Sequence, residues 1–272
     1  MRKYILPGAT LAAVALAAFL GGLKFERQTY SMTASSVQAS MLFLAAAALV
    51  MPAIFELVEG RGLPSPGAER VDFGATVEHL SVAVAVVLIF TYLAGLLFSL
   101  RTHRDLFNPA REEEEEPGFG WSVRRSVAML AIAGVAVGVM SEVLVGSISE
   151  ASESVGLSEF FIGVIVVAIV GNAAEHWVAV LVAHKNKMDL AVNIAMGSAA
   201  QIALFVGPLL VIASFVIGPE PMALVFNGFE LGGVLLAILI ANLVTRDGES
   251  NWFEGVQLLG LYAILGIAFF YA

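Results

Sequence analysis

Apolar runs long enough to cross a lipid bilayer recur along the whole of this sequence and constrain its fold more than any other feature. Stretches of 18 or more residues with almost no charge are typical of transmembrane helices. Hydrophobic residues make up 59% of the chain and charged residues 14%, whereas soluble domains contain about half and a quarter. A lipid-facing segment has to satisfy its own backbone hydrogen bonds as a helix. We therefore predict an all-α, polytopic transmembrane helical bundle.

The spacing of the apolar runs predicts eight spans, at 4–22, 37–56, 78–100, 125–148, 158–183, 191–217, 228–245 and 253–271. Lysine and arginine concentrate in short cytoplasmic loops of membrane proteins. One alternate set of loops contains ten of them: Lys24, Arg27, Arg101, Arg104, Arg111, Arg124, Arg125, Lys185, Lys187 and Arg246. The other set contains four: Arg2, Lys3, Arg61 and Arg70. This asymmetry predicts a multi-pass protein of the cell membrane with loop 101–124 in the cytoplasm and both termini outside.

Two parts of the chain have the same layout in opposite orientations. The segment FLGGLKFERQTYSMTASSVQASMLFLAAAALV (19–50) is similar in pattern to FVIGPEPMALVFNGFELGGVLLAILIANLV (215–244), so the first three spans repeat as the last three. Repeats that invert across the membrane are typical of secondary transporters. The N-terminal run also has the pattern of a signal peptide, but its place in the repeat favours a retained helix. Spans four and five have no counterpart before the first span, so a complete duplication needs two more spans.

Polar side chains interrupt the fifth span at GNAAEH (171–176). Asn172, Glu175 and His176 are spaced i, i+3 and i+4, which predicts one shared helix face. A carboxylate inside a membrane is costly and is a functional candidate by default. Burial favours its protonated form until a cation displaces the proton, which is the chemistry of proton-coupled exchange. The alternative is a packing contact in which protonated Glu175 donates a hydrogen bond to a neighbouring carbonyl.

The sixth span adds neutral oxygen donors. Ser198 and Gln201 are spaced i and i+3. Gly197, directly before Ser198, has no side chain to cover its backbone carbonyl. Carboxylate, hydroxyl, amide and carbonyl oxygens suit a hard cation such as Ca²⁺, although hydrogen bonding between helices is the alternative. We expect Gly171 to allow close helix approach and Glu142, inside the fourth span, to lie on the ion pathway.

Several other functions are excluded or disfavoured. The chain has no cysteine, so it has no disulfide and no thiolate metal site. The net charge of −9 and the lack of a basic patch exclude nucleic acid as a partner. An intramembrane hydrolase using Glu175 and His176 lacks a second metal ligand at a suitable spacing and a serine paired with a base. We expect no enzyme and no resident cofactor, only transported Ca²⁺ and H⁺.

The segment VGNAAEHWVAVLVAHKNKMDLAVNIAMGSAAQIALFVGPLLV (170–211) resembles the second cation-binding repeat of the calcium/proton antiporters, the CAX family of the cation/calcium exchanger superfamily. Further likeness lies in 141–170, 91–107 and 21–55. This resemblance implies an inverted-repeat fold of eleven spans, of which about eight are present here. It implies that Glu175 is the shared proton and cation ligand, with Asn172, Ser198 and Gln201 beside it.

The resemblance also divides the chain into three parts. Residues 1–100 correspond to the remainder of the first repeat, 101–124 to a cytoplasmic acidic linker that contains Glu112–Glu116, and 125–272 to the second repeat. The family's first GNxxE motif has no match before residue 171. A truncated chain, a split transporter with an N-terminal partner segment, and a homo-oligomer that completes the site remain open.

The expected function is alternating-access exchange of Ca²⁺ for H⁺ across the bilayer. The alternative is a non-transporting or partner-requiring subunit of a split cation exchanger. The choice among Ca²⁺, Mn²⁺, Na⁺ and K⁺ stays open, since each of them can bind oxygen ligands.

Overall fold

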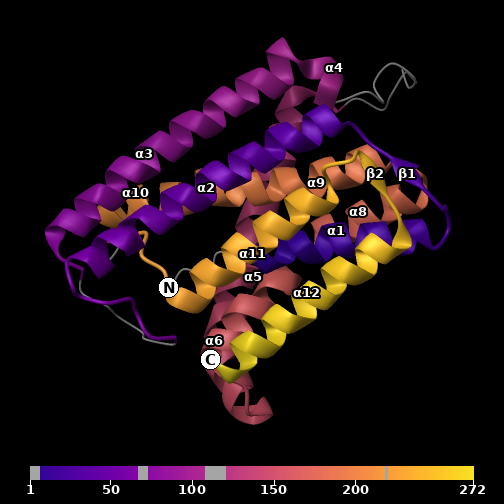
Figure 1. Cartoon of the computed structure of the whole chain (residues 1–272). Coiled ribbons are helices and arrows are strands. Elements are labelled where there is room, and N and C mark those ends of the chain that lie inside the picture. Colours follow the sequence, from indigo (N-terminus) through magenta and orange to yellow (C-terminus); the bar gives the residue numbers. More distant parts are fainter. Residues whose placement is uncertain (1–6, 67–72, 108–120, 218–219) are drawn as a thin grey trace.

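The computed structural model describes residues 7–66, 73–107, 121–217 and 220–272, and these fold as a bundle of helices (Figure 1). The first half contains α1 (Pro7–Gly22), α2 (Met32–Val58), α3 (Ala75–Leu97) with its π-helical extension η1 (Phe98–Thr102), and α4 (Arg104–Phe107). The second half begins with α5 (Val123–Val155), α6 (Glu159–Phe161), η3 (Ile162–Val167), α7 (Ala168–Gly171) and α8 (Ala173–His184). It ends with α9 (Met188–Gln201), η4 (Ile202–Val206), α10 (Gly207–Ile217), α11 (Gly228–Val244) and α12 (Trp252–Tyr271).

The predicted all-α membrane fold is confirmed. In the described part of the chain, five helices are long and apolar enough to cross a membrane, and the bent pair Glu159–Gly171 and Ala173–His184 makes a sixth. The remaining two predicted spans correspond to shorter apolar helices, Leu11–Gly22 and Gly228–Val244. Within the described residues, each predicted span is therefore helical, apart from a break at Asn172. The acidic run Glu112–Glu116 lies outside the described residues.

Helix α1 lies at the centre of the bundle, where it packs against α8, α9, α11 and α12. Its residues Leu11–Ala15 are at most 5% exposed. Two glycines allow close backbone contacts between α1 and α12: a Cβ on Gly22 would lie 2.2 Å from the backbone nitrogen of Trp252, and one on Gly255 would lie 2.3 Å from that of Phe19. Small residues at helix interfaces let backbones approach in this way, so α12 lies directly along α1.

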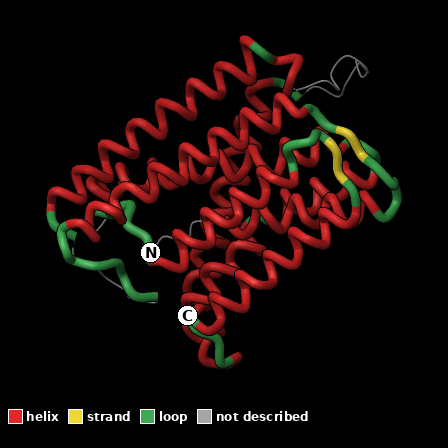
Figure 2. The backbone as a smooth tube through the Cα atoms, viewed as in Figure 1, coloured by secondary structure: helices red, strands yellow, loops and turns green. Residues whose placement is uncertain are grey.

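Hydrogen bonds join three loops at one end of the bundle, and we call this region the loop clamp (residues 27–31, 183–189 and 247–251). Its two strands, β1 (Gln28–Thr29) and β2 (Glu249–Ser250), pair antiparallel with Gln28 opposite Ser250, and they are the short yellow segments in Figure 2. The buried Gln28 side chain donates from Nε2 to the carbonyl of Ala183, 2.7 Å away, and to Oδ1 of Asn186, 3.2 Å away. The clamp therefore links α1–α2, α8–α9 and α11–α12.

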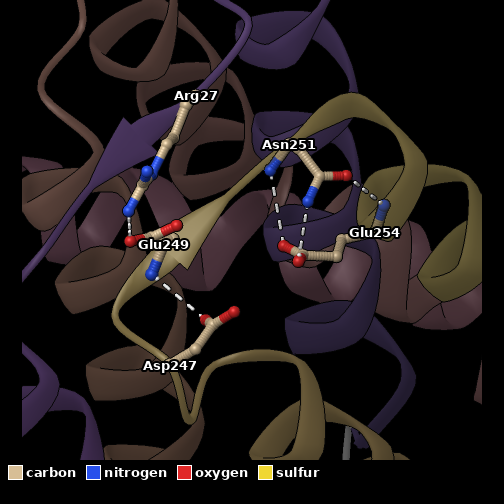
Figure 3. Close-up of polar contacts among 5 residues, drawn as sticks. All are labelled: Arg27, Asp247, Glu249, Asn251 and Glu254. Carbon is tan, nitrogen blue, oxygen red and sulfur yellow. Dashed lines mark hydrogen bonds and ion pairs between the residues drawn. The ribbon is translucent and has the colours of Figure 1, made fainter.

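Charged groups add to the loop clamp (Figure 3). Arg27 forms an ion pair with Glu249, whose backbone N–H donates to Oδ1 of Asp247 over 3.1 Å. Asn251 and Glu254 cap the start of α12 by exchanging side-chain-to-backbone hydrogen bonds. Burial, and secondarily the nearby carboxylates, raise the pKa of the Tyr30 phenol within the clamp. Tyr30 is therefore held neutral.

Helix α5 differs from the rest of the bundle. Nearly all its described side chains are exposed, including apolar ones such as Val123 and Leu130 at 81% and 74%. Its contacts are made mainly with α6 and η3, near its C-terminal end. It runs to Val155, seven residues beyond the predicted end of this span at 148, and Gly156 ends it with a positive φ of 69°.

Candidate functional site

The fifth span is broken where its polar motif begins. Helix α7 ends at Gly171, α8 begins at Ala173, and the two halves of the span differ in direction by 51°. Asn172 lies between them with φ −110° and ψ 15°, and its Nδ2 donates to the carbonyl of Ala168 over 2.9 Å. Asparagine side chains compete with helical backbone hydrogen bonds in this way. The expectation of one uninterrupted helix through Asn172, Glu175 and His176 is therefore wrong at Asn172.

Glu175 and His176 occupy the first turn of α8, immediately after the break. Glu175 is half-buried and His176 is 8% exposed. A helix N-terminus carries unpaired backbone N–H groups and a partial positive charge that favours a nearby anion. Discontinuous spans in transporters use such ends to bind ions and substrates. The break thus gives Glu175 an environment that a continuous helix lacks.

The predicted residues of the sixth span lie on α9, which packs against α8. Gly197 and Ser198 are half-buried and Gln201 is exposed. Among the described residues, no hydrogen bond joins Glu175 to Ser198 or Gln201, and no group of three or more His, Asp or Glu side chains is placed to hold a metal ion. Ca²⁺ takes six to eight oxygen ligands, so these residues by themselves are an incomplete set.

A pocket of about 580 Å³ lies between α2, α3 and α9 and reaches one part of this set. Gly197 and Gln201 line it, together with Gln38, Tyr92 and Asn193. Glu175 is not among the lining residues. The structure therefore divides the predicted site between the break at Asn172 and this pocket.

Two predicted accessory residues have few neighbours. Glu142 lies on α5 and is exposed. A Cβ on Gly171 would meet no atom within 4 Å, so close helix approach is not the reason for this glycine in the described structure. It instead ends α7 next to Asn172.

Sequence reasoning missed the two amides that connect α2 to α9. Nε2 of Gln38 donates to Oδ1 of Asn193 over 2.8 Å. Both are amides within otherwise apolar spans, and such residues commonly hydrogen-bond across helices. That signal identifies them as candidates, but it does not show that they face each other.

Comparisons with known proteins agree over nearly the whole chain. A family described as "Sodium/calcium exchanger protein" matches residues 125–271. The chain is 42% identical over 284 residues to a Ca(2+)/H(+) antiporter of Synechocystis sp. and 41% identical over 268 residues to the Ca(2+)/H(+) antiporter ChaA of Bacillus subtilis. Each alignment covers 97% of this chain and 72% of the relative. A solved structure titled "Structure of native YfkE" superposes with a TM-score of 0.77 at 36% identity, over 99% of this chain and 73% of that one.

Proposed function

Because this chain belongs to the sodium/calcium exchanger family, we propose that it takes part in the exchange of Ca²⁺ for H⁺ across a membrane, with Glu175 as the group that binds either ion. The observation that carries this proposal is the half-buried Glu175 in the first turn of α8, directly after the break in the span. The names of the relatives support exchange over a non-transporting role.

The proposed chemistry uses one carboxylate for two ions. Desolvation in the membrane favours the neutral, protonated acid, whereas a Ca²⁺ ion favours the carboxylate. The two ions therefore exclude each other at Glu175, and alternating access turns this exclusion into coupled movement. Asn172 sets the local backbone, and Ser198 and Gln201 supply neutral oxygens from α9.

The incomplete ligand set supports a second part to the proposal. A single carboxylate with neutral oxygens falls short of a Ca²⁺ shell, so we infer that another membrane segment, from a longer form of this chain, from a partner or from a second copy, supplies further oxygens. The uncovered surface of α5 and the exposed Glu142 on it offer a place for that segment.

We also propose the orientation in which loop 101–124 is cytoplasmic and both termini are outside. The loops that meet in the clamp contain Lys24, Arg27, Lys185, Lys187 and Arg246, and basic loops favour the cytoplasmic side. The family match over 125–271 supports the start of a second repeat at 125.

The test is the substitution Glu175→Gln, which keeps the size of the side chain and removes its ability to release a proton. We expect proton-driven ⁴⁵Ca²⁺ uptake into everted membrane vesicles to fall to background. Glu153→Gln is the matched control, because Glu153 is exposed near the end of α5, and it should retain nearly full uptake. Unchanged uptake with Glu175→Gln would remove this residue from the mechanism.

A further inference from the structure

The last turn of α2 contains a buried carboxylate, at the end of the bundle opposite the loop clamp (Figure 1). Glu56 is 3% exposed, although it lies within an apolar span. We propose that Glu56 is a second proton-binding site of this chain, where a proton and the guanidinium of Arg61 compete for one carboxylate and thereby release or attach the loop between α2 and α3. The site lies on a different helix from Glu175 and does not depend on the proposed function.

The end of α2 places Arg61 beside Glu56. Gly60 follows the helix with a positive φ of 75°, the conformation in which glycine commonly ends a helix. The backbone N–H of Gly60 donates to the carbonyl of Leu57, and that of Arg61 donates to the carbonyl of Glu56, each over 3.1 Å. These two bonds return the chain over the last turn of α2, so Arg61 lies next to the Glu56 side chain.

The contact between the two side chains is an ion pair and not a hydrogen bond. Nη1 of Arg61 lies 3.9 Å from Oε1 of Glu56, which is too long for a hydrogen bond. Oε1 is buried and accepts no hydrogen bond from the described part of the chain. A buried carboxylate is costly without a counter-ion and hydrogen bonds. Ionised Glu56 therefore depends on Arg61, whereas protonated Glu56 does not.

Arg61 also connects this ion pair to the neighbouring segments. Its Nη2 lies 3.4 Å from Oε2 of Glu59, and a Cβ on Gly74 would lie 2.8 Å from its Nη1. Gly74 is the N-cap residue of α3, so the guanidinium lies against the backbone at the start of that helix. The Arg61 side chain is 51% exposed and can turn into water when Glu56 becomes neutral. The loop would then lose a polar contact with both helices.

The other titratable groups at this end do not replace Arg61. The elements packed here are the start of α3, the extended segment before α11, and α11 itself. Their titratable side chains are Glu78, His79, Glu220 and Glu230. Three of these are acidic, and His79 is exposed. Within the described residues, the cation that pairs with Glu56 is therefore Arg61.

The surroundings of Glu56 suit a proton and not a metal ion. Ca²⁺ takes six to eight oxygen ligands, and no group of three or more His, Asp or Glu side chains among the described residues is placed to hold a metal ion. The guanidinium of Arg61 repels any metal cation that approaches the carboxylate. The Glu56 side chain keeps 3% of its surface exposed, and this contact with solvent allows it to take up a proton.

The direction of the response follows from these charges. At high pH, ionised Glu56 retains Arg61 and the loop between α2 and α3 is held. At low pH, protonated Glu56 no longer needs a counter-ion, so Arg61 is released and the loop becomes mobile. If the proposed orientation holds, this end of the bundle faces the outside, and the loop responds to the external proton concentration.

Spin labelling tests this response, because the chain has no native cysteine. Ser65 is exposed in the loop, and Ser36 is exposed near the other end of α2. A nitroxide would be attached to Ser65→Cys or to Ser36→Cys in the purified protein, and electron paramagnetic resonance would measure its mobile fraction. As the pH falls from about 8 to about 4, the range in which exposed and buried carboxyl groups titrate, we expect this fraction to rise at least about twofold at Ser65. At Ser36 it should stay constant.

Three further substitutions identify the carboxylate that responds. Glu56→Gln keeps the size of the side chain and removes its charge, so the Ser65 label should be mobile at every pH. Arg61→Gln should have the same effect, and an unchanged Ser36 label in both variants would show that the bundle is intact. Glu59→Gln is the matched control, because Glu59 also contacts Arg61 but is exposed, and it should keep the rise at low pH.

Three results would overturn the proton site. One is an immobile Ser65 label at high pH in either Glu56→Gln or Arg61→Gln, and another is loss of the pH response in Glu59→Gln. The third is an immobile label at low pH after addition of millimolar Ca²⁺, which would show a metal site instead.

The outcome can be separated from that of the proposed function. Glu175→Gln should abolish ⁴⁵Ca²⁺ uptake and leave the pH response of the Ser65 label unchanged. Normal uptake by Glu175→Gln together with an intact pH response would disprove only the role of Glu175. Abolished uptake by Glu175→Gln in a protein whose Ser65 label never responds to pH would disprove only the proton site at Glu56.

Discussion

The loop clamp and helix α5 differ in how they are attached to the rest of the bundle. In the clamp, short polar segments from three distant loops are joined by strand pairing, by the Gln28 side chain and by the Arg27–Glu249 ion pair. Helix α5 has 33 residues and a long apolar surface, yet it is attached mainly through α6 and η3. Apolar surface does not drive association between helices in lipid, because lipid tails are equally apolar. Close packing and hydrogen bonds therefore decide which helices stay together.

The largest expected effect is on stability, and it is measured by making the same leucine-to-alanine substitution in the core and on α5. Leu204 is fully buried and Leu130 is 74% exposed on α5. We expect Leu204→Ala to lower the free energy of unfolding by about 2–5 kcal/mol, through the cavity that it leaves. Leu130→Ala should change it by less than about 0.5 kcal/mol. Denaturant unfolding of the purified protein in mixed micelles measures both, and a large loss with Leu130→Ala would mean that α5 is covered by another segment.

The next effect tests the close packing of α12 on α1. Gly255→Ala places a methyl group 2.3 Å from the backbone nitrogen of Phe19, whereas a Cβ on Gly260 of the same helix meets no atom within 4 Å. We expect Gly255→Ala to cost about 1–3 kcal/mol through overpacking. Gly260→Ala should be neutral or stabilising by up to about 1 kcal/mol, because alanine favours the helix. Thermal unfolding compares the pair, and equal midpoints would contradict the close approach.

The smallest effect tests the clamp itself. Gln28→Ala removes the donor to the carbonyl of Ala183 and to Oδ1 of Asn186. Because the Ala183 carbonyl still accepts from the backbone N–H of Asn186, we expect a cost of about 0.5–1.5 kcal/mol. Gln257→Ala on the exposed surface of α12 is the matched control and should change little. Faster hydrogen exchange at the 183–189 loop should accompany Gln28→Ala. Unaltered exchange there would show that the loops do not depend on this side chain.

The fold could largely be predicted because apolar runs report membrane spans directly. The same patterns could not reveal the break at Asn172, since the periodicity of 171–176 was interpreted on a straight helix and the competing hydrogen bond from Asn172 to Ala168 is a local choice. The end of α5 could have been predicted from Gly156, because glycine commonly follows the last residue of a helix and adopts a positive φ there. The strands β1 and β2 carried none, because two-residue segments have no periodicity.

The candidate site was predictable in its residues but not in its arrangement. A carboxylate within a membrane span identifies Glu175, and the hydroxyl and amide of Ser198 and Gln201 follow from helical spacing. Spacing along one helix says nothing about which neighbour each side chain faces. Gln201 lies on the pocket with Gln38, which belongs to a span in which the sequence patterns indicated no candidate site residue. Such contacts depend on how α2 crosses α9 and are set by the tertiary fold.

The pairing of Gln28 with Ser250 has a consequence for how the protein is made. These residues are 222 positions apart, and at about 5–20 residues per second the ribosome needs roughly 10 to 45 s to synthesise the chain between them. Throughout that time the early helices sit in the membrane without their polar fastening. The final hairpin then completes assembly, so premature termination before it would release a loosened bundle to cellular quality control.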